Sequence, residues 1–520
     1  MARSYDLTSG SIPQHLLRLA APLIMGNILQ QLYNTVDAFI LGRFAGELEF
    51  AAVGVAGSVM NLFLFMITGA CTGISVIFAQ LYGAGERERF RREHWLSLSC
   101  GLLVTLACSG LGFLLLSPLL QFIQTPSELK TFVSVYLTII LASLPAEFLY
   151  NLYGALLRAI GRANAALMAF AAAVTVNVAL DYCFVARFQL GIAGAAWATA
   201  ASQAISAVLC ILYLRRKAPE LIFARAYCRM DGELSKQTAH FSFVTALHQS
   251  SLYIGKLLVQ GAVNTGGTDM ISAYTATTRI EGFANSFGDS GSAATSVLVA
   301  QNRGAGKEER VKEPFRSSLF LMLAMSLIMY VSASTSVGFM LGTRSGAAFE
   351  NARDYLKLVA LFYTLCFTGN TFAGYFNGIG KVSVPFLGAT SHIALRVVLS
   401  WLLVGKMGPP PSRWQQASAG CWSTRCGPLS NGGWRKSRKQ QNVILCKHQK
   451  PRAPRRTAFD KFCAVSPLIE MRGKEMTFLR KHEVFAHMGK PCRKRKTFVR
   501  DALCLLNFCK VKLFYNSSKW

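Results

Sequence analysis

The apolar residues of this 520-residue chain are gathered into long blocks instead of being spread at the spacing of a soluble core. A block of about 20 residues or more is long enough for a helix to cross the hydrocarbon of a bilayer. Backbone groups find no partners in lipid, so each block is expected to be a helix. The sequence therefore predicts an all-α membrane protein. The eleven predicted spans lie near residues 16–40, 52–79, 95–119, 131–153, 164–186, 192–214, 241–262, 271–299, 316–341, 355–378 and 384–404.

Basic residues between the spans predict how the chain is oriented. They cluster in the loops after the second, fourth, sixth and eighth spans, for example at Arg87, Arg158, Arg215 and Arg303. Short loops rich in Lys and Arg stay in the cytoplasm, so we expect a cytoplasmic amino terminus. Residues 1–14 are polar and lack the apolar core of a removable signal peptide. We therefore expect a multi-pass protein of the plasma (inner) membrane that is anchored by its first span.

A repeat at a separation of about 220 residues predicts two related halves. The segment Ala79–Arg89 recurs as Ala300–Arg310, each time at the end of the second span of a half. A looser pair, residues 153–162 and 375–381, leaves the fourth span of each half. Six spans separate the copies, so the two halves run in the same direction across the membrane. The pattern predicts two parallel six-helix repeats.

The second repeat is predicted to lack its last helix. We assign residues 1–217 to an amino-terminal lobe of six helices, residues 218–404 to a carboxy-terminal lobe with five recognisable helices, and residues 405–520 to a basic tail outside the membrane. The tail has 26 Lys or Arg against 5 Asp or Glu. Read one nucleotide out of register, Arg413–Gln416 becomes an apolar stretch similar to residues 197–199. We therefore interpret the tail as disordered or frameshift-derived sequence and expect no nucleic-acid partner.

Two carboxylates, Asp37 and Asp181, lie inside predicted spans. A charge at the bilayer centre costs roughly 2.5 to 3.5 kcal/mol, and such acids usually line a watery cavity and handle protons or cations. Asn177 lies four residues before Asp181 and shares its helix face. Gln30 and Asn34 form a polar stripe with Asp37 on the first span. These positions indicate a site for a passing cation.

Thr199 adds a hydroxyl from the Ala-rich sixth span. Together, the carboxylates, amides and hydroxyl predict an oxygen-rich site for a proton or a hard cation such as Na⁺. Two carboxylates that come close together disfavour double ionisation, which promotes proton capture. The alternative is that the Asn and Thr side chains only form hydrogen bonds between helices. The cysteine spacings predict no other metal site and no disulfide framework.

Other polar residues within the spans keep open roles. Arg279 and Glu281 are two residues apart and do not face each other on a helix. Lys256 and Arg396 are each either a buried partner or a side chain that reaches the interface. Pro22 removes a backbone hydrogen bond from the first span, which predicts either a hinge that couples protonation to shape or a static kink.

The chain resembles the multidrug and toxic compound extrusion transporters, in the prokaryotic branch that includes the DNA-damage-inducible F proteins. The resemblance covers residues 1–404 through Pro22–Ile24, Asn34–Asp37, the two repeated helix ends, and Asn177–Asp181. It implies twelve helices in two lobes, a central cavity, and export of organic cations or other amphipathic compounds in exchange for Na⁺ or H⁺. It implies no cofactor other than the coupling ion. The implied ion-coupling residues are Asp37, Asn177, Asp181 and Thr199, and the implied cavity residues are Gln30, Asn34, Tyr136 and Asn151.

The leading expectation is a monomeric antiporter in a lipid bilayer, not an enzyme, that exports small amphipathic or cationic substrates by alternating access. One alternative is a flippase for lipid-linked saccharides from the same superfamily. Its anionic cargo would call for a cavity rich in Arg and Lys. Another alternative is a non-functional, truncated transporter product. The sequence does not identify the substrate or distinguish Na⁺ from H⁺ as the coupling ion.

Overall fold

Eleven long helices account for almost all of the described chain. A computed structural model describes residues 7–228, 231–264, 268–341 and 347–407, and within these ranges it has no strand. The long helices are α1 (Ile12–Phe44), α2 (Glu47–Gly83), α3 (Arg87–Leu114), α5 (Ser127–Ala159), α6 (Ala163–Asp181), α7 (Gly191–Lys217), α8 (Gly232–Asn264), α9 (Thr268–Gly304), α10 (Glu308–Leu341), α11 (Ala347–Gly378) and α12 (Ser383–Met407). The short elements are α4 (Leu116–Phe122), the π-helix η1 (Tyr182–Arg187), and the 3₁₀ turns η2 (Pro219–Leu221) and η3 (Arg225–Tyr227).

The eleven predicted spans each coincide with one long helix, which confirms the all-α prediction. The predicted third span extends beyond the end of its helix. The helix α3 ends at Leu114, and the residues that follow form the separate short helix α4. The fifth span combines α6 with η1. The helix α12 ends at Met407, and residues 408–520 lie outside the described part of the chain. The missing twelfth helix and the origin of the tail therefore remain predictions, as do the boundaries of the three assigned regions.

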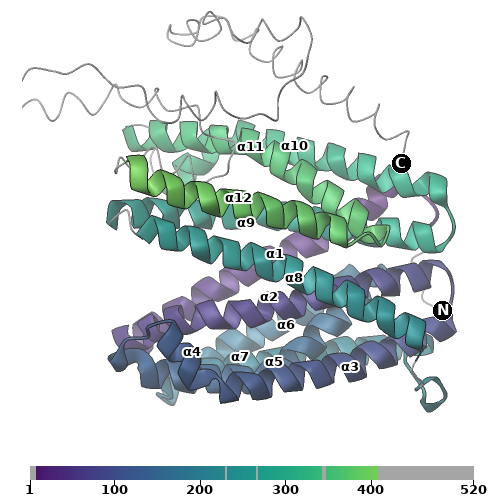
Figure 1. Ribbon diagram of the computed structural model, residues 1–520, viewed down its shortest axis with the longest axis horizontal. Helices are drawn as coiled ribbons and strands as arrows, with labels where there is room; N and C mark the ends of the chain where they lie inside the picture. The colour runs from purple at the N-terminus through teal and green to yellow at the C-terminus, as the bar shows by residue number, and fades with distance from the viewer. Residues whose placement is uncertain (1–6, 229–230, 265–267, 342–346, 408–520) are drawn as a thin grey trace, which may run out of the picture. The chain divides into compact units, whose positions relative to one another are not determined.

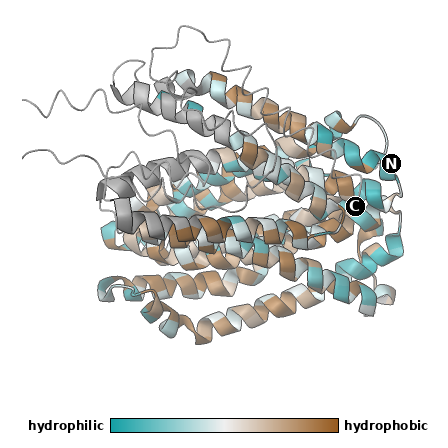
Figure 2. Ribbon diagram, turned by 45° about the horizontal axis from the view of Figure 1, so that its top comes forward, coloured by the Kyte–Doolittle hydropathy of each residue, from teal (hydrophilic) through white to brown (hydrophobic). Residues whose placement is uncertain are grey.

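Length and hydropathy qualify six of the described helices as candidate membrane spans. Five of them are in the first half, α2, α3, α5, α6 with η1, and α7, and the sixth is α10 up to Ser332. The first helix falls short because it carries polar residues such as Asn27, Gln30 and Asp37. Figure 2 shows apolar residues along the helix shafts and hydrophilic residues gathered at the helix ends, most densely near the amino terminus.

The helices form two packed sets that follow chain order (Figure 1). In the first set, α5 packs against α2, α3 and α7, and α1 packs against α6. In the second set, α11 packs against α9 and α10, and α12 packs against α8. The sets meet where α2 contacts α8 and α9, and where α1 contacts α9. Fully buried side chains such as Phe78, Leu152 and Leu156 belong to the largest core cluster, which lies mostly in the first set and extends into α8 and α9 of the second set.

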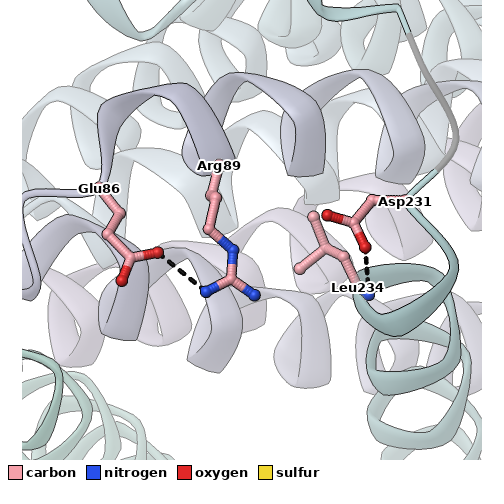
Figure 3. Close-up of polar contacts among 4 residues, drawn as sticks. All are labelled: Glu86, Arg89, Asp231 and Leu234. Atoms are coloured by element: carbon pink, nitrogen blue, oxygen red, sulfur yellow. Dashed lines mark hydrogen bonds and ion pairs between the residues drawn. The ribbon is translucent and has the colours of Figure 1, made fainter.

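Local hydrogen bonds at the helix ends fix where the second set begins. The carboxylate of Asp231 accepts a hydrogen bond from the backbone N–H of Leu234 at 3.2 Å, as an N-cap residue does. Figure 3 shows this cap beside the first turn of α3, where Arg89 donates to Glu86 at 3.0 Å. That ion pair is exposed on both sides, so it contributes little to stability.

Two prolines lie within helices of the first set. Pro145 in α5 has no N–H to bond with the carbonyl oxygen of Leu141. The hydroxyl of Ser109 on α3 donates to that oxygen instead, at 2.7 Å. Pro22 is buried within α1, and the helix continues through it from Ile12 to Phe44. Neither proline therefore ends its helix.

The repeated Ala-Gln…Gly-Ala-Gly segments meet each other at the end of the bundle that holds the amino terminus. A β-carbon added at Gly83 would collide with the backbone of Gln301, and one added at Gly304 would collide with the backbone of Gln80. Small residues permit such close helix contacts in membrane proteins. The two contacts are reciprocal, as two-fold pseudosymmetry requires.

The two glutamines complete this contact from both sides. Gln80 of the first set donates to the carbonyl oxygen of Gly378 in the second set at 3.1 Å. Gln301 of the second set donates to the carbonyl oxygen of Ala159 in the first set at 2.5 Å. We call Gln80, Gly83, Gln301 and Gly304 the inter-lobe clasp. The repeat thus positions the two halves against each other at this end.

We expect Gly83→Val to destabilise the closed arrangement of the lobes. The added side chain overpacks a backbone contact, and such insertions cost about 1–3 kcal/mol. Thermal unfolding of the purified protein in detergent would show a lower Tm. The matched control is Gly54→Val on the same helix, where an added β-carbon meets nothing within 4 Å. Equal effects of the two substitutions would contradict the clasp.

Candidate functional site

The two acids predicted from the sequence lie together. Asp37 projects from α1, and Asp181 is the last residue of α6. Their carboxyl groups are close enough to interact directly. The Asp181 side chain is completely buried, whereas Asp37 is only half-buried. The structure therefore brings both carboxylates to one position inside the first set of helices.

The acid pair has no hydrogen-bond donors that would satisfy it. Both carboxylate oxygens of Asp181 and one oxygen of Asp37 are buried without a hydrogen-bond partner. The amide nitrogen and oxygen of Asn177, one turn earlier on α6, are also buried and unpartnered. Buried polar groups are normally paired, and an uncompensated buried charge is strongly destabilising. A proton, a cation or ordered water between these groups would supply the missing partner.

Two tyrosines that face the pair add hydroxyl groups to the site. Tyr33 lies four residues before Asp37, and its hydroxyl is 3.2 Å from the hydroxyl oxygen of Thr199 on α7. Tyr33 and Tyr136 both interact electrostatically with Asp37 and Asp181. The prediction of Tyr136 came from the family resemblance, and Tyr33 was missed. Its spacing of one helical turn from Asp37 could have identified it.

The chain widens into a π-helix immediately after Asp181. The backbone N–H of Phe188 donates to the carbonyl oxygen of Cys183, five residues earlier, at 2.9 Å. Single π turns within helices are frequent at functional sites. No residue between Tyr182 and Arg187 predicts this turn from sequence. It gives the end of α6 a geometry that a regular helix would not provide.

The remaining predicted cavity residues form hydrogen bonds with residues other than Asp37 and Asp181. Gln30 donates to Asn34 at 3.3 Å on an exposed part of α1. Asn151 donates to the carboxylate of Glu147 at 2.5 Å and accepts from Thr68 of α2 at 3.3 Å. Asn151 therefore belongs to a polar network between α2 and α5 that includes Glu147.

Three further acids within the described helices were not predicted as site residues. Glu147 on α5 and Glu93 on α3 are both buried, and Glu93 accepts hydrogen bonds from Ser97 at 2.6 Å and from Thr238 of α8 at 2.8 Å. Asp289 on α9 is exposed and interacts electrostatically with Lys256. Glu147 and Asp289 fall inside predicted spans, so their sequence positions carry the same signal as that of Asp37. The side chains of Arg279, Glu281 and Arg396 lie outside the described part of the structure.

The described side chains include no group of three or more His, Cys, Asp or Glu residues that could hold a metal ion. The acid pair instead combines two carboxylates with an amide and hydroxyl groups. Such oxygen donors suit a proton or a hard monovalent cation better than a transition metal.

The fold and the site define a class of protein, a polytopic helical transporter built from two parallel halves. The MatE family profile matches residues 22–183 and 243–402. The chain therefore belongs to the MatE family of multidrug efflux transporters, which confirms the resemblance found in the sequence.

Relatives and solved structures agree with this assignment. The chain is 25% identical over 408 residues to the probable multidrug resistance protein YpnP of Bacillus subtilis, covering 77% of this chain and 88% of YpnP. It is 23% identical over 390 residues to the probable multidrug resistance protein NorM of Thermotoga maritima, covering 72% and 82%. A solved outward-facing MATE family transporter has the same fold, with a TM-score of 0.73 at 18% identity over 81% of this chain and 94% of that chain.

We expect Asp181→Asn to raise the thermal stability of the protein in Na⁺-free buffer at alkaline pH. The substitution removes a buried charge that has no fixed partner, and an unsatisfied buried group costs about 1–3 kcal/mol or more when charged. The measurement is Tm in detergent. The control, Asp231→Asn, keeps a good helix cap and should leave Tm unchanged. A lower Tm for Asp181→Asn would contradict the absence of a fixed partner.

Proposed function

We propose that this protein is a secondary active exporter that expels amphipathic or cationic compounds in exchange for H⁺ or Na⁺. The observation that carries the proposal is the acid pair, whose buried oxygens lack donors among the described residues. Such a site favours a state in which a cation or proton is bound. The names of the relatives, multidrug resistance proteins, support the substrate class.

The coupling residues in this proposal are Asp37, Asn177, Asp181 and Thr199. The carboxylates supply the charge that attracts the ion, and the amide of Asn177 and the hydroxyl of Thr199 supply neutral oxygens. If the ion is Na⁺, these four residues hold it. If the ion is H⁺, the two carboxyl groups share it, because two close carboxylates resist ionising together. The hydroxyl of Tyr33 contacts the hydroxyl of Thr199 and so holds the Thr199 side chain in position beside the pair.

The proposed orientation puts the clasp on the cytoplasmic side of the plasma membrane. Basic residues gather at that end, and two of them also hold the amino-terminal segment. Lys307 donates to the carbonyl oxygen of Thr8 at 2.8 Å, and Arg310 donates to that of Gly10 at 3.0 Å. Basic loops stay in the cytoplasm. The arrangement described here is then closed towards the cytoplasm.

Alternating access follows if the lobes separate at the clasp end and close at the opposite end of the bundle. Binding of a monovalent cation or proton reduces the negative charge of the pair by one and so lowers the free-energy cost of burying it. Pro22 lies on the same helix as Asp37, which supports the proposal that α1 bends with ion occupancy. Drug binding and ion binding would then favour different states, and the ion gradient would drive export.

A flippase for lipid-linked saccharides has less support. The buried acids described in the first lobe are Asp181, Glu93 and Glu147. A pyrophosphate cargo requires basic groups. The acidic interior therefore favours a cationic passenger.

We expect Asp37→Asn combined with Asp181→Asn to abolish gradient-driven efflux. Proteoliposomes loaded with a fluorescent organic cation such as ethidium report efflux after a Na⁺ or pH gradient is imposed. Loss of the coupling site should reduce the initial rate at least about tenfold, which corresponds to about 1.4 kcal/mol. Asp231→Asn serves as the control because that acid is a helix cap far along the chain from the pair. Unchanged efflux by the double variant would refute the proposal.

We also expect Gln80→Ala combined with Gln301→Ala to open the clasp end more often. Both substitutions remove hydrogen bonds between the lobes without adding bulk. Hydrogen–deuterium exchange at the ends of α2 and α9 should then be faster than in the wild type. Exchange in α3 beyond residue 100 serves as the internal reference. Equal exchange at the helix ends in both proteins would show that the glutamines do not hold the lobes together.

A further inference from the structure

Glu147 is a buried acid that the proposed ion site does not use. It lies on α5, two residues after Pro145, and only 6% of its surface is exposed. Its carboxylate accepts a hydrogen bond from the amide of Asn151 and interacts with the side chain of Gln203 on α7. Within the described residues it has no ion pair. A carboxylate held only by neutral amides is compensated incompletely.

A strip of polar side chains connects Glu147 with the acid pair. Gln203 and Thr199 lie four residues apart on α7 and so share one face of that helix. Thr199 contacts the hydroxyl of Tyr33, which interacts with Asp37 and Asp181. The strip therefore runs from the pair, through α1 and α7, to α5.

Buried polar atoms without partners are concentrated along this strip. Of the thirteen such atoms found among the described residues, seven lie on Asp37, Asn177, Asp181, Gln203 and Ser206 of α1, α6 and α7. Besides the acid pair and Asn177, they include the side-chain oxygen of Gln203 and the hydroxyl of Ser206 on α7. Buried water normally satisfies such groups, with about three hydrogen bonds for each molecule. The strip therefore has the composition of a hydrated path.

The free oxygen of Gln203 suits a protonated Glu147. When Glu147 is ionised, it needs donors, and the amide groups of Asn151 and Gln203 provide them. When Glu147 takes up a proton, its hydroxyl needs an acceptor, and the unpartnered oxygen of Gln203 becomes that acceptor after rotation of the amide. An amide next to the carboxyl group thus serves both charge states.

Among the described residues, the side chains that interact with Glu147 are the neutral amides of Asn151 and Gln203, and no cation pairs with it. Arg158 on the same helix approaches from the clasp end, with its guanidinium group near Gly154. The interface with α6 near Tyr150 is aromatic, through Phe170. The titratable or charged groups that face this part of α5 are Cys71 on α2, His94 on α3, Tyr150, Tyr153 and Arg158 on α5, and Cys210 on α7.

We propose that Glu147 is a second proton-binding site of the first lobe, connected to the Asp37–Asp181 pair by the hydrated strip. The proton comes from water at the pair and passes along hydroxyl and water oxygens. It binds a carboxylate oxygen of Glu147 and returns by the same route, so no bond other than O–H changes. This inference rests on the proposed ion-coupled transport for its use in the cycle. The binding of the proton itself does not depend on transport.

The test is infrared difference spectroscopy of the full chain in liposomes between acidic and alkaline buffer. A protonated buried carboxyl group gives a carbonyl band that ionisation removes. We expect this band to persist when Asp37→Asn and Asp181→Asn remove the pair, and to be lost when Glu147→Gln is added. The matched control is Glu93→Gln, which changes another buried, hydrogen-bonded Glu, on α3. The carbonyl band of Glu147 must remain in this variant. A difference spectrum unaltered by Glu147→Gln would overturn the proposal.

Two further measurements separate this proposal from the proposed function. Gln203→Met keeps the size of the side chain but removes its amide, so we expect the Glu147 band to shift in frequency; an unshifted band would contradict the role of Gln203. In proteoliposomes, Glu147→Gln should slow efflux driven by a pH gradient while ethidium binding stays within about twofold of wild type. If the wild type shows no efflux, the transport proposal fails and the infrared result still decides whether Glu147 binds a proton.

Discussion

The first lobe depends on a charge that is buried without a partner. Asp181 is completely enclosed, and no donor among the described residues reaches either of its oxygens. In an apolar helix bundle, that arrangement is stable only with a proton, a cation or water in the gap. The surrounding features follow from this need. Asn177 adds a buried amide that also lacks a partner. The hydroxyl of Tyr33 contacts that of Thr199, and the π-helix after Asp181 changes the direction of the backbone at the end of α6.

The helix α5 links this interior chemistry to the contact between the lobes. Its carboxyl-terminal residue Ala159 accepts the hydrogen bond from Gln301 in the clasp. Two to three turns earlier, Asn151 and Glu147 form the polar network that faces α2 and α7. Under the proposed function, a change of charge at Glu147 would act on the same helix that makes the clasp contact. The helix α5 would then be the element that links ion occupancy with lobe closure.

The sequence predicts the helices and the acid pair well, because both rest on strong energetic constraints. Spans of about 20 apolar residues and charged residues inside them leave few alternatives, and the structure has a helix at each of the eleven predicted positions. Contacts that depend on packing across helices were not predictable. The bond from Ser109 to Leu141, the approach of Gln203 to Glu147 and the π-helix after Asp181 carry no local signal. Glu147 is a different case, since its position inside a span was visible and its significance depends on partners that only the fold reveals.

The two halves share their clasp but differ in the charges of their interiors. The repeated glycines and glutamines make equivalent contacts in both directions, which gives the lobes a pseudosymmetric surface on which to rotate. The described side chains of the second half include no equivalent acid pair. Lys256 and Asp289 lie on α8 and α9, and the sequence places a basic residue, Arg396, near the repeat position of Asn177. The pseudosymmetry relates the two lobes to each other and not the two ends of the bundle. Under the proposed function, an ion that binds only the first lobe favours one closed arrangement over the other, which is what a gradient-driven pump requires.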